Sequence, residues 1–232
     1  MPRLAGLALR WALLPFLLLL AQAMASEFWN ALRGQGLSPA WALHPLALWF
    51  AAGLGFRILF AFSLRRFGRD DPLEFLDTLE HELTHALVGY ATFCPPESLT
   101  ASLKAGGEVQ LRGSNPLAAL APYYLPLWCL IAVAIGVVVR PGLHAAWDHA
   151  LFALLGAFLY RLMREYRWRQ TDLHVYGFLF STVSVFILLL LTLALILSAR
   201  GLLSWHWLTA VAGHVRRAVP AAWEWAHRRM AA

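Results

Sequence analysis

Hydrophobic and polar positions divide this chain into long apolar runs separated by short polar or basic segments. The runs cover residues 3–25, 41–64, 115–139, 147–169 and 174–199. A transmembrane helix needs about 20 predominantly apolar residues, and each run approaches or exceeds that length. With a further helix at 72–93, the pattern predicts an all-α polytopic membrane protein of about five to six membrane helices.

The segment 72–93 has the pattern of an amphipathic helix. Asp71-Pro72-Leu73-Glu74 supplies an N-cap, a proline at the first helical position and a capping-box glutamate. An apolar face contains Leu76, Leu79, Leu83, Leu87 and Tyr90. A polar face contains Glu74, Asp77, His81 and His85. Ionisable residues within a membrane are functional by default, so this polar face predicts a site.

The segment after this helix has a different period. Residues 99–103 and 109–111 alternate apolar with polar positions, and Gly106-Gly107 lies between them. Alternation on both sides of a glycine pair predicts a short β-hairpin directly after the helix.

The helix carries the motif His81-Glu82-Leu83-Thr84-His85. Residues four apart lie on one helix face, so His81 and His85 can direct two imidazoles at one Zn²⁺ ion. Glu82 then lies beside the metal, where its carboxylate can act as a general base. Asp77, or less favourably Glu80, is expected to orient His81 through a hydrogen bond.

A catalytic zinc site usually has three protein ligands, so a third is expected near the edge of another span. The candidates are Asp172, His174 and the pair Asp148-His149. Each aspartate also fits the simpler role of a helix N-cap. The residues alone leave these alternatives open.

Composition supports a membrane protein. The chain of 232 residues is 60% hydrophobic and 14% charged, whereas soluble domains are about 25% charged. Its net charge of +6 is spread over arginines at segment ends, which indicates membrane topology and lipid contact. No basic patch accompanies a soluble fold, which excludes nucleic acid as the expected partner.

The arginines also constrain topology. Residues 65–69 and 161–169 are both basic and are both expected in the cytoplasm. Three full spans between them would put them on opposite sides. One intervening helix is therefore expected to be re-entrant or shallow, and 72–93 is a candidate. Arg57 and Arg161 are expected to extend toward an interface.

The ends of the chain complete the predicted organisation. Residues 1–25 are either a signal peptide, with Ala23-Met24-Ala25 as the cleavage site, or a first transmembrane helix. Residues 26–200 form the predicted membrane-embedded core, with a polar connection from Ser26 to Pro39. Residues 201–232 form a basic, amphipathic interfacial tail interrupted by Pro220.

The segment His81-Glu82-Leu83-Thr84-His85-Ala86-Leu87 resembles the zinc helix of the site-2 protease family of intramembrane metalloproteases. In that family a β-hairpin and a further span follow, and the entrance of a later span supplies an aspartate ligand. The resemblance covers roughly residues 70–190 and selects Asp172 as that ligand. The chain departs from the family in having Asp172-Leu173 where Asp-Gly is usual, and in an additional helix at 147–169.

The resemblance implies a zinc metalloendopeptidase that cleaves membrane proteins or peptides within the lipid bilayer. Its metal ligands are expected to be His81, His85 and Asp172, with Glu82 as the catalytic base. The hairpin is expected to bind substrate by strand addition. A multi-pass protein of the prokaryotic inner (plasma) membrane is the expected setting. The alternative is a non-catalytic zinc-binding membrane protein, a regulator or assembly factor, in which Glu82 is dispensable.

Overall fold

The computed structural model describes residues 2–34, 44–68, 71–102, 106–113, 115–168 and 170–230. It divides into two compact units. The first is Pro39–Ser181, and the second combines Met1–Ser38 with Thr182–Ala232. The predicted boundaries at residues 25 and 200 stay predictions. The predictions for Arg69, Leu103 and Arg169 lie outside the described residues.

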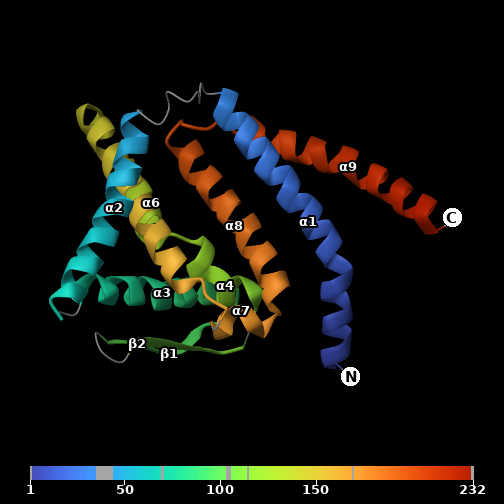
Figure 1. Ribbon diagram of the computed structural model, residues 1–232, viewed down its shortest axis with the longest axis horizontal. Helices are drawn as coiled ribbons and strands as arrows, with labels where there is room; N and C mark the ends of the chain where they lie inside the picture. The colour runs from blue at the N-terminus through green and yellow to red at the C-terminus, as the bar shows by residue number, and fades with distance from the viewer. Residues whose placement is uncertain are drawn as a thin grey trace. The chain divides into compact units, whose positions relative to one another are not determined.

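The first unit contains the motif helix and the hairpin (Figure 1). Its elements are α2 (Pro45–Arg66), α3 (Pro72–Ala91), β1 (Pro96–Ser102), β2 (Gly106–Leu111), α4 (Pro116–Tyr124), α5 (Leu127–Gly136), η2 (Pro141–Leu143), α6 (His144–Glu165) and α7 (Thr171–Val175). The second unit contains α1 (Pro2–Gly34), most of α8 (Phe178–Ala199) and α9 (His206–Met230).

Helices α2 and α6 pack side by side along their length (Figure 1). Two glycines make the close approach possible. A Cβ atom on Gly53 of α2 would lie 2.0 Å from the carbonyl oxygen of Ala153, and one on Gly156 of α6 would lie 2.1 Å from that of Phe50. Any larger residue at either position would force the two backbones apart.

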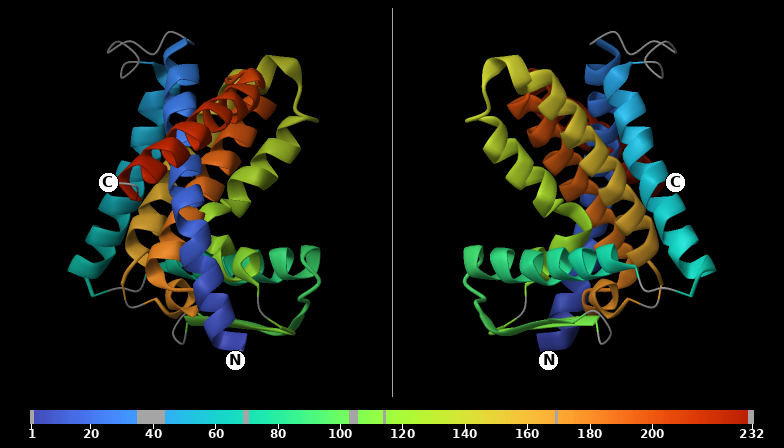
Figure 2. Two further views of the ribbon diagram at one scale, coloured as in Figure 1. Left: turned by 90° about the vertical axis from the view of Figure 1, so that its right-hand side faces the viewer. Right: turned by 90° about the vertical axis from the view of Figure 1, so that its left-hand side faces the viewer.

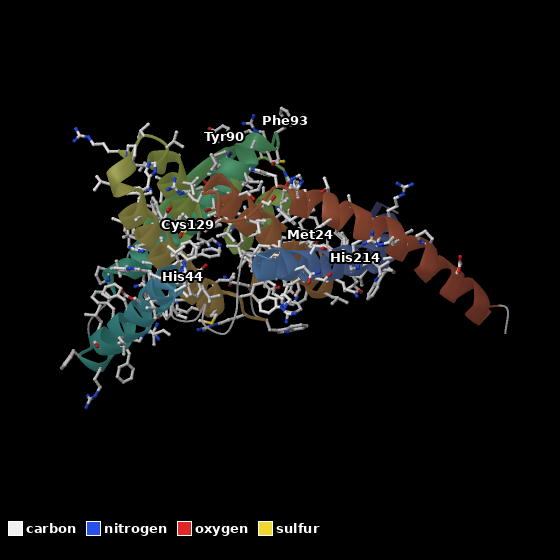
Figure 3. All side chains as sticks on the ribbon, turned by 90° about the horizontal axis from the view of Figure 1, so that it is seen from above. Met24, His44, Tyr90, Phe93, Cys129 and His214 are labelled. Carbon is white, nitrogen blue, oxygen red and sulfur yellow. The ribbon has the colours of Figure 1, made fainter. Side chains whose placement is uncertain are left out.

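The predicted start of α3 is confirmed. The Asp71 side chain accepts a hydrogen bond from the Leu73 amide at 2.9 Å, and Pro72 occupies the first turn. At the other end of α3, Tyr90 and Phe93 are exposed and extend away from the ribbon (Figure 3).

The predicted β-hairpin is also confirmed. Strands β1 and β2 pair antiparallel, with Leu99 opposite Val109 and Ala101 opposite Gly107. The hairpin lies alongside α3 (Figure 2). A glycine is again required where the two elements meet, since a Cβ on Gly89 of α3 would lie 2.6 Å from the carbonyl oxygen of Cys94.

Helices α4 and α5 form one apolar segment that bends by 73° at a short break. Pro126 has no amide proton, so the carbonyl of Pro122 cannot receive its usual helical hydrogen bond. The guanidinium of Arg161 donates to this carbonyl at 3.2 Å. Helix α6 therefore supplies the group that satisfies this carbonyl.

Among the described residues, four helices are long and apolar enough to cross a membrane, or five if the bent pair counts as one span. The four are Leu13–Gly34, Pro45–Arg66, Pro141–Glu165 and Phe178–Ala199. Helix α3 is not among them. Glu74 pairs with Arg65 at 3.2 Å and with Arg164 at 2.6 Å, so the basic ends of α2 and α6 lie together. That both ends face the cytoplasm stays a prediction.

The second unit has its own apolar core. The core consists of Leu14, Ala21, Ala23, Met24, Val183, Ile187, Ala194, Leu203, Trp207 and Val211. Met24 and His214, from α1 and α9, are labelled in Figure 3, and His214 pairs with Glu27 at 3.0 Å.

Two predictions in this unit are wrong. The expected connection from Ser26 is helical up to Gly34, because residues 26–33 contain neither proline nor glycine to end the helix. The expected interruption at Pro220 is absent, since α9 continues through it.

Candidate metal centre

The two histidines of the motif lie one turn apart on α3, and both rings are fixed by hydrogen bonds through Nδ1. His81 Nδ1 lies 3.0 Å from Glu165 Oε2, and His85 Nδ1 lies 2.7 Å from the carbonyl oxygen of Ala118. A carbonyl and a carboxylate can only accept, so both Nδ1 atoms carry protons and donate. Both Nε2 atoms remain available as ligands.

Asp172 faces these two nitrogens from α7. Its Oδ2 atom lies 3.7 Å from the Nε2 atoms of both His81 and His85. The Tyr123 hydroxyl donates to the same oxygen at 3.1 Å, and the adjacent Leu173 is fully buried. The carboxylate is therefore held in place from both its own helix and α4.

The three side chains form a group that could hold a metal ion. Among the described residues, the ligand atoms of His81, His85 and Asp172 form one group within 4.8 Å of one another. Tetrahedral zinc with bonds of about 2.0–2.1 Å requires ligand atoms about 3.3 Å apart. The carboxylate oxygen lies 3.7 Å from each of the two imidazole nitrogens, so these two distances need only a small contraction to reach that spacing.

Glu82 lies beside this group, at the wall of a cavity of about 430 Å³. The cavity is lined by all three candidate ligands, by Glu82, by residues of β2 and by Asn115, Gln170 and Thr171. Glu82 is 7% exposed, and burial raises the pKa of its carboxyl while the neighbouring His81 and His85 oppose that rise. A carboxylate of raised pKa is suited to general-base chemistry near neutral pH.

Neighbouring charges shift the pKa values of His81 and Asp172 in opposite directions. Burial disfavours the charged imidazole, but the carboxylates of Asp172 and Glu165 outweigh it and raise the pKa of His81 to about 9. Burial acts against charge on Asp172 too, yet the nearby imidazoles of His81 and His85 hold the pKa of its carboxyl well below its usual range. A cation would replace the His81 proton.

The other predicted third ligands lie elsewhere. His174 is exposed, contacts the carbonyl of Trp168 and packs against the Trp168 ring. His149 stacks on Trp49 with ring centroids 5.6 Å apart, on the α2–α6 pair. Asp148 precedes His149 on α6. None of these three residues belongs to the group formed by Asp172 and the two motif histidines.

The prediction that Asp77 or Glu80 orients His81 is wrong. Asp77 binds the Arg57 guanidinium at 2.5 Å, and Glu80 lies 3.3 Å from Arg161 Nε. Both arginines are buried, at 4% and 1% exposure, rather than extended toward an interface. Buried guanidinium groups require opposite charges, and α3 supplies them.

Glu165 is the functional candidate that sequence reasoning missed. It occupies the place beside His81 that was assigned to Asp77, although 84 residues separate it from His81. The one local signal is its position four residues after Arg161, at the end of a helix. That spacing indicates an ion pair within α6 and gives no information about α3.

Comparison with known proteins adds no relative. No family model matches the chain, and neither a curated protein nor a solved structure matches it.

Proposed function

We propose that this chain is a membrane-embedded zinc metalloprotease, similar in its chemistry to the site-2 protease family. The observation that supports the proposal best is the convergence of His81, His85 and Asp172 from two helices, with ligand atoms within 4.8 Å. Two histidines from one helix turn and a distant carboxylate make a three-ligand catalytic set. A zinc ion held there would polarise a peptide carbonyl and acidify a water molecule.

Within this proposal each residue of the chain has a defined task. Glu82 accepts a proton from the attacking water and returns it to the leaving amine. Glu165, Ala118 and Tyr123 hold the two imidazoles and the Asp172 carboxylate in place. The cavity beside β2 provides room for an extended peptide, which exposes the bond to be cut.

The position of the site suggests which side of the membrane it faces. Glu165 ends α6, and Arg164 next to it shares Glu74 with Arg65 from the end of α2. The site thus lies near the basic ends of two candidate spans. Basic ends favour the cytoplasm, so we place the cut at the cytoplasmic end of a membrane-spanning substrate.

A non-catalytic zinc-binding role is the second candidate, and one contact favours it. Gly107 of β2 lies directly against Glu82, so a Cβ there would be 2.5 Å from Glu82 Cγ. The side chain of the proposed base is therefore also a packing contact for the hairpin. A regulator or assembly factor would keep the metal and use Glu82 only for packing.

Glu82→Gln separates the two candidates. The purified chain is incubated in detergent with a set of single-span reporter peptides, and products are identified by mass spectrometry. The protease proposal requires cleavage by wild type, loss of cleavage with Glu82→Gln, and one zinc per chain in both. If zinc is present and wild type cleaves none of the peptides, the non-catalytic role is favoured.

A further inference from the structure

Glu165 is the acidic side chain hydrogen-bonded to Nδ1 of His81, and it comes from a different helix. The two acids of α3 that most closely precede His81, Asp77 and Glu80, are bound to Arg57 and Arg161 instead. The Glu165 carboxylate is 15% exposed, and its Oε2 lies 3.0 Å from His81 Nδ1. This hydrogen bond fixes which ring nitrogen carries the proton and where the other nitrogen points.

Arg161 holds Glu165 in this position from one turn earlier on α6. Its Nη1 atom lies 3.5 Å from Glu165 Oε2, and its Nε atom lies 3.3 Å from Glu80 Oε2. At 1% exposure, Arg161 is among the most buried side chains of the described residues. A guanidinium buried to this degree is retained only where it is paired.

The same arginine satisfies the break between α4 and α5. It donates to the Pro122 carbonyl, which Pro126 leaves without a helical partner. On the other side of the break, the Trp128 amide at the start of α5 donates to Glu80 Oε1 at 3.1 Å. Arg161 and Glu80 therefore cap both ends of the break, while Arg161 also holds Glu165 against His81.

We propose that Glu165 is a positioning residue for the metal ligand His81, held by Arg161 in one buried network with the α4–α5 break. The inference rests on the proposed function, because it concerns how this chain holds zinc. It assigns a specific task to α6, the additional helix by which the sequence departs from the site-2 protease pattern. Glu165 acts through His81 and does not contact the cation.

The test is zinc affinity of the full chain in detergent, measured against a chromophoric chelator after metal removal. Outer hydrogen-bond partners of metal ligands contribute about 10–100-fold in affinity, so Glu165→Ala is expected to bind zinc 10–100-fold more weakly than wild type. Glu165→Gln retains an acceptor for Nδ1 and is expected to lose less. The matched control is Glu97→Ala, which removes an exposed carboxylate paired with Arg112.

A second readout is the visible absorption spectrum of the Co²⁺-loaded protein, which reports ligand orientation. A shifted spectrum in Glu165→Ala and Glu165→Gln, but not in Glu97→Ala, supports positioning. Wild-type affinity and an unchanged spectrum in both Glu165 variants overturn it while leaving the metal site intact. If Glu165→Ala fails to fold by circular dichroism, Glu165→Gln decides by the same two criteria. Wild type that binds no stoichiometric zinc contradicts the proposed function itself.

Discussion

Gly107 of the hairpin packs directly on the Glu82 side chain of α3. A Cβ atom at residue 107 would lie 2.5 Å from Glu82 Cγ and 2.8 Å from Glu82 Oε1. The strand that lines the cavity and the proposed base are therefore positioned by one contact, and the absence of a side chain at residue 107 permits it.

Gly107→Ala is expected to displace either the Glu82 carboxylate or strand β2. Small displacements of catalytic groups can cost about 100-fold in rate, so we expect a roughly ten- to hundredfold fall in kcat/KM with zinc retained. Peptide cleavage and metal content measured on the same preparation test this. Ser98→Ala, on the exposed part of β1, serves as the control. Full activity in Gly107→Ala would show that the contact does not position Glu82.

Asp172→Ala is expected to weaken zinc binding by more than the roughly 10–100-fold that loss of an outer partner costs, because it removes a direct ligand. His174→Ala and Asp148→Ala remove the competing candidates and are expected to keep one zinc per chain. Metal content after dialysis against a weak chelator distinguishes the three variants. Zinc lost from the His174 or Asp148 variant, and retained by Asp172→Ala, would contradict the assignment.

Zinc affinity is expected to rise with pH between 7 and 9. The pKa of His81 is raised to about 9, so below that pH zinc must displace a proton from the ring. Each unit of pH below 9 therefore lowers the zinc affinity about tenfold through protonation of His81, and above pH 9 His81 no longer contributes to the pH dependence. Asp172 contributes no slope in this range, because its pKa lies well below its usual value. Chelator competition at several pH values measures the slope, and a flat profile from pH 7 to 9 refutes the prediction.

Gly53→Ala is expected to destabilise the α2–α6 pair, because the new Cβ would lie 2.0 Å from the Ala153 carbonyl oxygen. Overpacking of this kind costs about 1–3 kcal/mol or more. Gly55→Ala on the same helix has open space around its Cβ and is expected to be neutral or slightly stabilising. Unfolding midpoints of the two variants in detergent give a matched comparison. Equal midpoints would show that the two helices separate at no cost.

Local signals predicted local structure well. The cap at Asp71, the helix that follows and the β-hairpin each depend on side chains within a few residues, and each is confirmed. Pro126 disfavours a continuous helix because it lacks an amide proton, and the chain bends by 73° at the break between α4 and α5. The extension of α1 to Gly34 was missed because polar residues after Ser26 were interpreted as a connection.

The candidate site was predictable only in part. The spacing of His81 and His85 follows from helix geometry, and Asp172 was selected by resemblance rather than by pattern. The partner of His81 was misassigned because Asp77 lies on the same helix face, whereas Glu165 is separated by 84 residues. Asp77 binds Arg57 instead of His81, and no periodicity in the sequence relates Arg57 to Asp77.

The core shared by α1, α8 and α9 has a consequence for how the chain is made. Leu14 and Met24 emerge from the ribosome early, but their partners Val183 and Trp207 follow more than a hundred residues later. Helix α1 is therefore synthesised before the unit Pro39–Ser181, whereas its partners in α8 and α9 are synthesised after most of that unit. Contacts this distant in sequence form slowly, so the unit that contains the proposed site can fold first. Packing of α1 against α8 and α9 is the expected last step of folding.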